Sequence, residues 1–188
     1  LGEGGQGLVA LCLFVPFILF SGWAGPLADR VSKRTVAIWM KVVELPLALT
    51  AGVGFITNNL RLTMTAMVLL ATQSTFFSPA KYGMIPEIVR EDRVSRANGI
   101  LNMPTNIAVI TGMLIAGLFS DGLSDSQHVW NHWLPGIALS LVAIIGLVAI
   151  VCLPRLSPMS ASTKVSLNPI GTYIETAKRA WGSPIITG

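Results

Sequence analysis

Five apolar stretches, each about as long as a membrane is thick, constrain this chain more than any other feature. They cover residues 7–28, 36–56, 62–80, 100–120 and 134–153. A hydrocarbon core of about 30 Å is crossed by roughly 20 helical residues. The stretches lack the polar–apolar alternation of barrel strands, and a helix is the other structure that satisfies its backbone in lipid. The sequence therefore predicts an all-α membrane protein with five transmembrane helices.

The composition agrees with this fold class. Only 12% of the 188 residues are charged, whereas soluble domains carry about 25% charged residues. A soluble enzyme and a disordered tail are both excluded on this ground. The net charge of +4 comes without a basic stripe with interleaved aromatic residues, so we expect no nucleic acid partner. The expected environment of the chain is a lipid bilayer.

Basic residues mark alternate loops, which orients the predicted bundle. The loop at 121–133 contains no Lys or Arg. Positively charged loops stay in the cytoplasm, so the first loop, the third loop and the segment after the fifth stretch are predicted to be cytoplasmic. Their basic residues are Arg30, Lys33 and Arg34; Arg90, Arg93 and Arg96; and Arg155, Lys164, Lys178 and Arg179.

We expect two parts in a chain that is an internal fragment of a longer protein. Residues 1–153 form a partial transmembrane bundle, and residues 154–188 form a cytoplasmic linker that runs into another span. In the linker, Asn168 and Pro169 are typical of a helix start, and Ile170, Tyr173 and Ile174 recur at helical spacing. This pattern predicts an amphipathic helix on the cytoplasmic surface of the membrane.

A charged cluster follows the first stretch. An acid at the end of a helix is unfavourable alone, so Asp29 should have a cation or the N-terminus of another helix as a partner. The residues of the cluster are Gly25, Asp29, Arg30, Lys33 and Arg34. They resemble the cytoplasmic gate motif of the major facilitator superfamily, although Ser32 replaces its second glycine.

The resemblance implies a fold and a mechanism. The five stretches would be helices two to six of a twelve-helix transporter, within its N-terminal six-helix half. In the superfamily this acid contacts the other half of the protein and closes the cytoplasmic gate. The implied activity is solute transport by alternating access.

A second motif lies at the end of the third stretch, and Arg96, Ala97, Asn98 and Gly99 follow it. Its residues are Ser78, Pro79, Lys81, Tyr82 and Gly83. Together these residues resemble the bacterial lysophospholipid transporter branch. This resemblance implies inward movement of lysophospholipid across the bacterial inner membrane, and an acyltransferase as a partner or fused domain. The third stretch has no arginine before Lys81, and the fourth lacks a Gly-Pro pair, so a drug/proton antiporter is disfavoured.

Two charged residues lie within the second stretch, three positions apart, where their side chains can pair. A rise of 1.5 Å per residue from Val36 places Lys41 about 8 Å deep and Glu44 about 12 Å deep. Lys41 can extend toward the surface, whereas Glu44 needs a cavity or a partner. Two interpretations stay open: Glu44 serves the substrate or the coupling ion, or the two residues form a structural pair.

Four polar residues share one face at the start of the fourth stretch, namely Asn98, Asn102, Thr105 and Asn106. Lipid disfavours such a face, so it must contact protein or water. It either lines a cavity or forms hydrogen bonds between helices.

No other pattern indicates chemistry. His128 and His132 have helical spacing, but no tight third ligand accompanies them, so no metal site is expected. We also expect no cofactor and no catalytic activity. Two alternatives to lysophospholipid transport remain: a superfamily transporter of a drug, sugar or metabolite, and the membrane portion of a fused acyltransferase. Polar residues at depth, such as Glu44, favour transport over an anchor.

Overall fold

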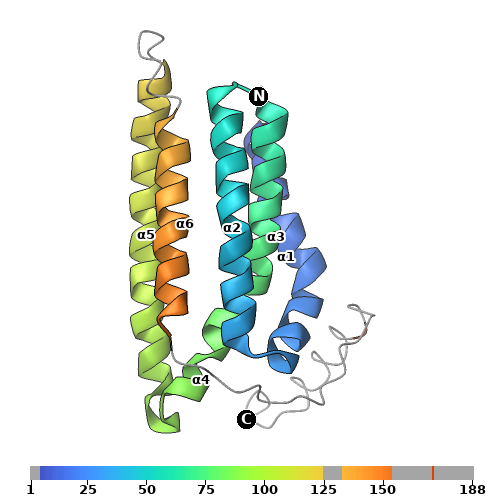
Figure 1. Ribbon diagram of the computed structural model, residues 1–188, viewed down its shortest axis with the longest axis vertical. Helices are drawn as coiled ribbons and strands as arrows, with labels where there is room; N and C mark the ends of the chain where they lie inside the picture. Colours follow the sequence, from blue (N-terminus) through green and yellow to red (C-terminus); the bar gives the residue numbers. More distant parts are fainter. Residues whose placement is uncertain (1–4, 125–132, 154–170, 172–188) are drawn as a thin grey trace.

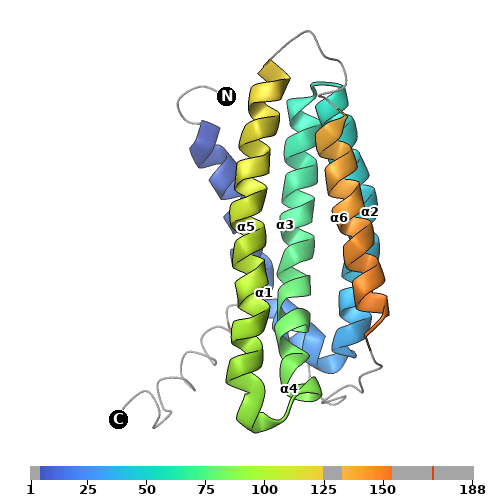
Figure 2. The same ribbon diagram turned by 90° about the vertical axis from the view of Figure 1, so that its left-hand side faces the viewer.

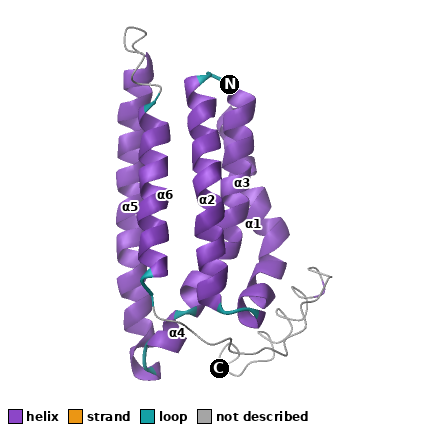
Figure 3. Ribbon diagram, viewed as in Figure 1, coloured by secondary structure: helices purple, strands orange, loops and turns teal. Residues whose placement is uncertain are grey.

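The computed structural model describes residues 5–124, 133–153 and 171. Within these residues the fold is helical and contains no strand (Figure 3), which confirms the all-α prediction. The helices are α1 (Gly5–Arg30), α2 (Lys33–Ile56), α3 (Leu60–Gly83), α4 (Ile85–Ile88), the 3-10 helix η1 (Glu91–Arg93), α5 (Val94–Ser124) and α6 (Leu134–Val151).

Four helices in the described residues have both the length and the apolar composition of a membrane span: Gly7–Arg30, Lys33–Ile56, Glu91–Phe119 and Leu134–Val151. The fifth predicted span, α3, has 24 residues and therefore the length. Its hydroxyl and amide side chains make it less apolar than the others. Gln73 and Thr75 are buried against neighbouring helices rather than exposed, so α3 tolerates these polar residues because protein covers them.

Two helix boundaries differ from the prediction in ways that matter for the motifs. The first helix continues through Asp29 and Arg30, so the acid lies in its last turn. The fourth predicted span starts earlier than residue 100, at Val94, which brings Asn98 into α5. The predicted linker helix after Asn168, apart from Gly171, and the residues His128 and His132 lie outside the described part of the chain.

The long helices pack unequally (Figures 1 and 2). Backbone packing is extensive between α3 and both α1 and α2, and between α2 and α6. In contrast, the main backbone neighbours of α5 are α4 and η1, the short helices that lead into it. A buried apolar cluster joins α1, α2, α3 and α6 at one end of the bundle. Its members are Ala28, Val36, Ala37, Ala80, Met84 and Ile150.

Glycines bring α2 and α6 together at the opposite end. A Cβ atom added to Gly52 would lie 3.0 Å from the Cα of Gly136, and one added to Gly136 would lie 2.7 Å from the Cα of Gly52. No side chain fits in that space without a shift of the backbone. These two glycines therefore allow α2 and α6 to approach closely at this end.

Candidate functional site

The two motifs identified in the sequence lie at the same end of the bundle. Side chains of α2 reach both α4 and the C-terminal end of α6 there. We call this the basic end, because it carries Arg30, Lys33, Arg34 and Lys81. The apolar cluster around Ala37 and Ala80 lies at this end too and fixes the backbones that carry these charges.

Lys33 is the centre of a buried ion-pair cluster. Its side chain is 4% exposed, and its Nζ lies 2.5 Å from Glu87 Oε1 on α4 and 3.7 Å from Asp29 Oδ1 on α1. Asp29 therefore has the cation partner expected for an acid at the end of a helix. The cluster ties three helices together, and it leaves Asp29 56% exposed.

Gly83 connects the second motif to the first. A Cβ atom at this position would lie 2.7 Å from Cε and 2.9 Å from Cδ of Lys33. The aliphatic part of Lys33 thus passes across the end of α3 on its way to Glu87. Glycine at position 83 is what leaves room for this path.

The other gate residues have different surroundings. Arg34 donates from Nε to the carbonyl oxygen of Leu153 and from Nη2 to that of Val151, both at 2.8 Å. Carbonyl groups at a helix end lack helical partners and attract cations, so Arg34 fastens the end of α6 to the start of α2. Arg30 is exposed. A Cβ atom at Gly25 would meet no atom within 4 Å.

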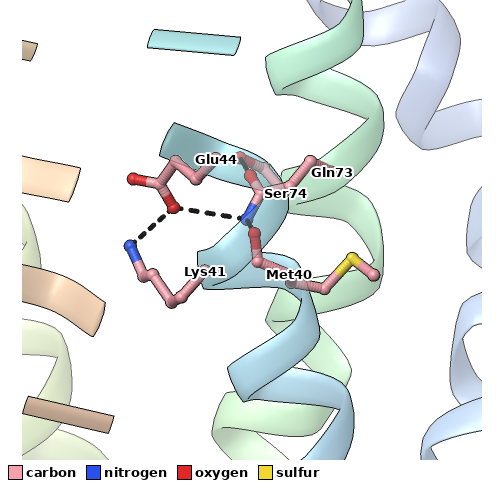
Figure 4. Close-up of polar contacts among 5 residues, drawn as sticks. All are labelled: Met40, Lys41, Glu44, Gln73 and Ser74. Atoms are coloured by element: carbon pink, nitrogen blue, oxygen red, sulfur yellow. Dashed lines mark hydrogen bonds and ion pairs between the residues drawn. The ribbon is translucent and has the colours of Figure 1, made fainter. Parts of the chain in front are cut away.

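The pair inside α2 forms as the spacing predicts (Figure 4). The Nζ of Lys41 lies 2.7 Å from Oε2 of Glu44, and each side chain is 17% exposed. Gln73 of α3 donates from Nε2 to the same Glu44 oxygen at 3.3 Å and to the carbonyl of Met40 at 3.0 Å. Ser74 donates to the Gln73 amide oxygen at 3.3 Å. The Glu44 carboxylate is thus held by two donors, as the structural interpretation requires.

Lys41 also contacts the neighbouring helices. Its Nζ lies 4.9 Å from the centroid of the Phe77 ring on α3, a distance at which a cation is attracted to an aromatic face. A Cβ atom on Gly146 of α6 would lie 3.0 Å from the same Nζ. Lys41 therefore lies between helices in the bundle instead of extending to the surface.

The second motif meets the polar face of α5. Lys81 donates from Nζ to Oγ1 of Thr105 at 3.0 Å, and Tyr82 donates from its hydroxyl to Oδ1 of Asn102 at 2.9 Å. These two members of the face form hydrogen bonds between helices. Asn98 is half-buried and Asn106 is exposed.

Lys81 has no carboxylate partner among the described residues. The Tyr82 ring centroid lies 5.3 Å from its Nζ. Earlier in the motif, Ser78 donates to the carbonyl of Ser74 at 2.9 Å, and Pro79 lies inside α3. The motif thus delivers one partly buried cation whose nearest polar partner is a neutral hydroxyl.

A cavity of about 490 Å³ lies at the basic end between α2, α3, α4, α5 and α6. Lys41 and Lys81 are the charged residues of its lining, and Glu44 is not part of it. The structure therefore places Lys41, rather than the deeper Glu44, at the cavity. The remaining lining residues are Phe77, Met84, Ile85, Ile88, Leu101, Gly146, Ala149, Ile150 and Leu153.

Sequence reasoning missed two residues of this site. Gln73 is an amide in the middle of a predicted span, and such a group needs a partner in lipid, so its position was a usable signal. Glu87 is an acid in a basic loop, but its pairing with Lys33, 54 positions away, depends on how the helices pack. No group of three His, Cys, Asp or Glu residues suited to a metal is found in the part of the chain that the structure describes.

The sequence is similar to several known proteins. The Lysophospholipid transporter LplT of Photorhabdus laumondii is 29% identical over 152 residues, which cover 81% of this chain and 35% of that protein. LplT of Pectobacterium carotovorum is 33% identical over 144 residues, with 75% and 31% covered, and LplT of Cronobacter sakazakii is 26% identical over 145 residues, with 76% and 32% covered. These relatives are named as transporters.

The chain spans about a third of the length of these relatives. No solved structure matches it. The family model described as the Major Facilitator Superfamily matches residues 1–188, the whole of the sequence. Together with the apolar helices, this match shows that the chain belongs to the Major Facilitator Superfamily.

Proposed function

We propose that this chain is part of an alternating-access transporter for lysophospholipid, and that the cavity at the basic end receives the phosphate-bearing head group. The observation that carries the proposal is the lining of this cavity: two lysines in a wall that is otherwise apolar. An anionic head group attached to a hydrocarbon chain has the matching chemistry. The cavity volume of about 490 Å³ falls in the usual range for small-molecule sites.

Charge balance indicates that Lys81 makes the main contact with the phosphate of the head group. A partly buried cation is unfavourable unless an anion compensates it. Glu44 compensates Lys41, whereas Lys81 has the neutral Thr105 hydroxyl. An entering phosphate would supply the missing negative charge to Lys81, with Lys41 as a second, shared cation.

The gate motif fits the same proposal. Lys33 and Arg34 make contacts inside this part of the protein, while Asp29 and Arg30 are exposed at the basic end. We assign Asp29 and Arg30 to contacts with the other half of the transporter in the state closed to the cytoplasm. Rocking of the halves would then expose the cavity to alternate sides.

The location and the partners follow from the same proposal. The transporter belongs in a bacterial inner membrane, with the basic end in the cytoplasm as the loop charges predict. Lysophospholipid delivered to that side is a substrate for an acyltransferase, which could be a separate or a fused domain. The chain itself is assigned no catalytic step.

The two alternatives account for less of the structure. A sugar or another polar solute calls for several polar side chains in the lining, and this lining is apolar apart from Lys41 and Lys81. A membrane anchor gains nothing from a partly buried cation at a cavity, and Lys81 is such a cation, with no carboxylate partner in the described part of the chain.

Uptake of radiolabelled lysophosphatidylethanolamine into proteoliposomes that contain the full-length protein tests the proposal. We expect uptake by the wild type and a loss of about tenfold or more in Lys81→Gln, because a charge-assisted contact disappears. Arg90→Gln is the matched control, since this side chain is 81% exposed, and it should transport normally. The proposal is wrong if the wild type does not take up the lipid or if Lys81→Gln retains full uptake.

A further inference from the structure

We infer that the acyl chain of the lipid lies between α5 and α6 and extends from the cavity at the basic end, here the head-group cavity, into a second cavity. This inference rests on the proposed function, because it assigns a site to the rest of the same lipid. The second cavity has a volume of about 340 Å³ and lies between α2, α5 and α6. None of the described residues that line it has a polar side chain.

One face of α6 lines both cavities. Leu139 and Val142 line the second cavity, and Gly146 and Ala149 line the head-group cavity. Residues three or four positions apart share a face of a helix. Because Val142 and Gly146 are one turn apart, the two linings follow each other along α6 without a break.

α5 presents a second face to the same two cavities. Leu101 lines the head-group cavity, and Gly112 and Ala116 line the second cavity. Leu101 and Gly112 are about three helical turns apart, so they lie on the same face. α5 and α6 have little backbone packing with each other, and Figure 2 shows them apart. The two faces therefore border one groove, which we call the α5–α6 groove and define by Leu101, Gly112, Ala116, Val142 and Gly146.

The length of the α5–α6 groove suits one acyl chain. From Leu139 to Ala149, α6 rises about 15 Å at 1.5 Å per residue. A hydrocarbon core of about 30 Å contains two leaflets of lipid, so the chains of one leaflet span about 15 Å. A chain whose head group is bound at Lys81 would therefore end in the second cavity.

The charges give the bound lipid its direction. Lys41 and Lys81 line the head-group cavity at the basic end. The second cavity lies toward the other end, because Pro135, the second residue of α6, is part of its lining. The site is thus cationic at one end and apolar at the other, which complements a lipid with an anionic head group. One groove accepts one chain, which favours a lipid with a single acyl chain over a lipid with two.

Gly112 keeps the α5–α6 groove open. A Cβ atom at this position would meet no atom within 4 Å, so a larger side chain can enter the groove without a clash. Gly112→Leu should therefore exclude the acyl chain and keep the fold. Gly117→Leu is the matched control: Gly117 lies in the same helix, a Cβ atom there also meets no atom within 4 Å, and Gly117 does not line the cavity.

Photolabelling of the full-length protein in nanodiscs tests the inference. The probes are two lysophosphatidylglycerols, one with a diazirine at the end of the acyl chain and one with a diazirine next to the ester. Mass spectrometry of peptides locates the labelled residues. An excess of unlabelled lysophosphatidylglycerol removes labelling at a specific site and leaves labelling that comes from contact with bulk lipid.

We expect the chain-end probe to label the second cavity, for example at Leu139 and Val142, and the ester probe to label residues near Leu101. The competitor should remove both. Gly112→Leu should lose the chain-end labelling at the second cavity and keep the ester labelling, while Gly117→Leu should resemble the wild type.

Three results would overturn the inference. They are competed chain-end labelling away from the second cavity, chain-end labelling that the competitor does not remove, and chain-end labelling of the second cavity that persists in Gly112→Leu. The first two come from the wild type and do not depend on the folding of a variant. The absence of competed labelling by either probe would instead overturn the proposed function, so the two failures are distinguishable.

Discussion

Lys33 and Lys81 lie at the same end of the bundle, but their side chains have different partners. The difference indicates that the two cations have different roles. Lys33 is 4% exposed and lies between the carboxylates of Asp29 and Glu87. Lys81 contacts the hydroxyl of Thr105 and the ring of Tyr82, on the wall of a cavity. These two carboxylates balance the charge of Lys33, whereas Lys81 has no carboxylate partner among the residues that the structure describes. This contrast suggests that Lys33 holds the fold and Lys81 serves a ligand.

The largest loss of stability should come from a substitution of Lys33, whose charge is balanced by two carboxylates. Lys33→Met leaves Glu87, 13% exposed, without its partner, and loss of one member of a buried pair costs about 3–5 kcal/mol. Thermal unfolding of the full-length protein in detergent should show a clear drop in melting temperature. Lys81→Met should keep or raise it, because an uncompensated charge is removed. Equal losses in both variants would contradict the contrast between the two regions.

The second largest loss of stability should come from a side chain at Gly83, where the aliphatic part of Lys33 crosses the end of α3. Gly83→Ala places a Cβ atom 2.7 Å from Cε of Lys33, and such overpacking costs about 1–3 kcal/mol. Gly112→Ala is the control, since a Cβ atom there meets no atom within 4 Å and alanine favours the helix. The melting temperature should fall in the first variant and hold or rise in the second. A Gly83→Ala protein as stable as the wild type would show that Lys33 takes another path.

The Lys41–Glu44 pair shares features with both regions. The charge of Lys41 is balanced by Glu44, as that of Lys33 is by its partners. Lys41 also lines the cavity, as Lys81 does. Lys41→Gln, Glu44→Gln and the double variant form a cycle, for which we expect a coupling of about 1 kcal/mol in stability. Lipid affinity should fall more in Lys41→Gln than in Glu44→Gln. An additive cycle would show that the pair is not structural, and a larger loss of affinity in Glu44→Gln would place the functional charge on the carboxylate.

The smallest effect should come from an exposed pair at the same end. The side chains of Arg90 and Asp92 are 81% and 58% exposed, with 3.4 Å between Nε and Oδ1. Exposed ion pairs contribute about 0–1 kcal/mol. Asp92→Asn should therefore leave the melting temperature nearly unchanged, which makes burial the quantity that separates Lys33 from Arg90. A drop as large as that of Lys33→Met would remove burial as the explanation.

Local features of this fold could be predicted from the sequence. The length of each apolar stretch located the helices, because a membrane fixes how many residues a span needs. The Lys41–Glu44 pair followed from helical spacing within α2. The requirement that Asp29 have a partner also followed from its place at the end of a helix, and Lys33, four positions away, supplies it.

Contacts between distant segments could not be predicted in the same way. Lys81 and Thr105 were each noted in the sequence, yet their hydrogen bond depends on how the ends of α3 and α5 meet. Glu87 and Gln73 find their partners on α2 only after the helices pack. The burial of Gln73 and Thr75 in α3 likewise depends on the neighbouring helices that cover them. Packing decides which polar residues are buried.

The most direct test of the account is the effect of Lys81 on the recognition of phosphate. Native mass spectrometry of the full-length protein can compare lysophosphatidylglycerol with a monoacylglycerol of the same acyl chain, which lacks the phosphate. The wild type should bind the phosphate-bearing lipid at least about tenfold more tightly. Lys81→Gln should reduce this preference to near equality and leave the affinity for the neutral lipid unchanged. A preference that persists in Lys81→Gln would contradict the account, because the head group would then bind elsewhere.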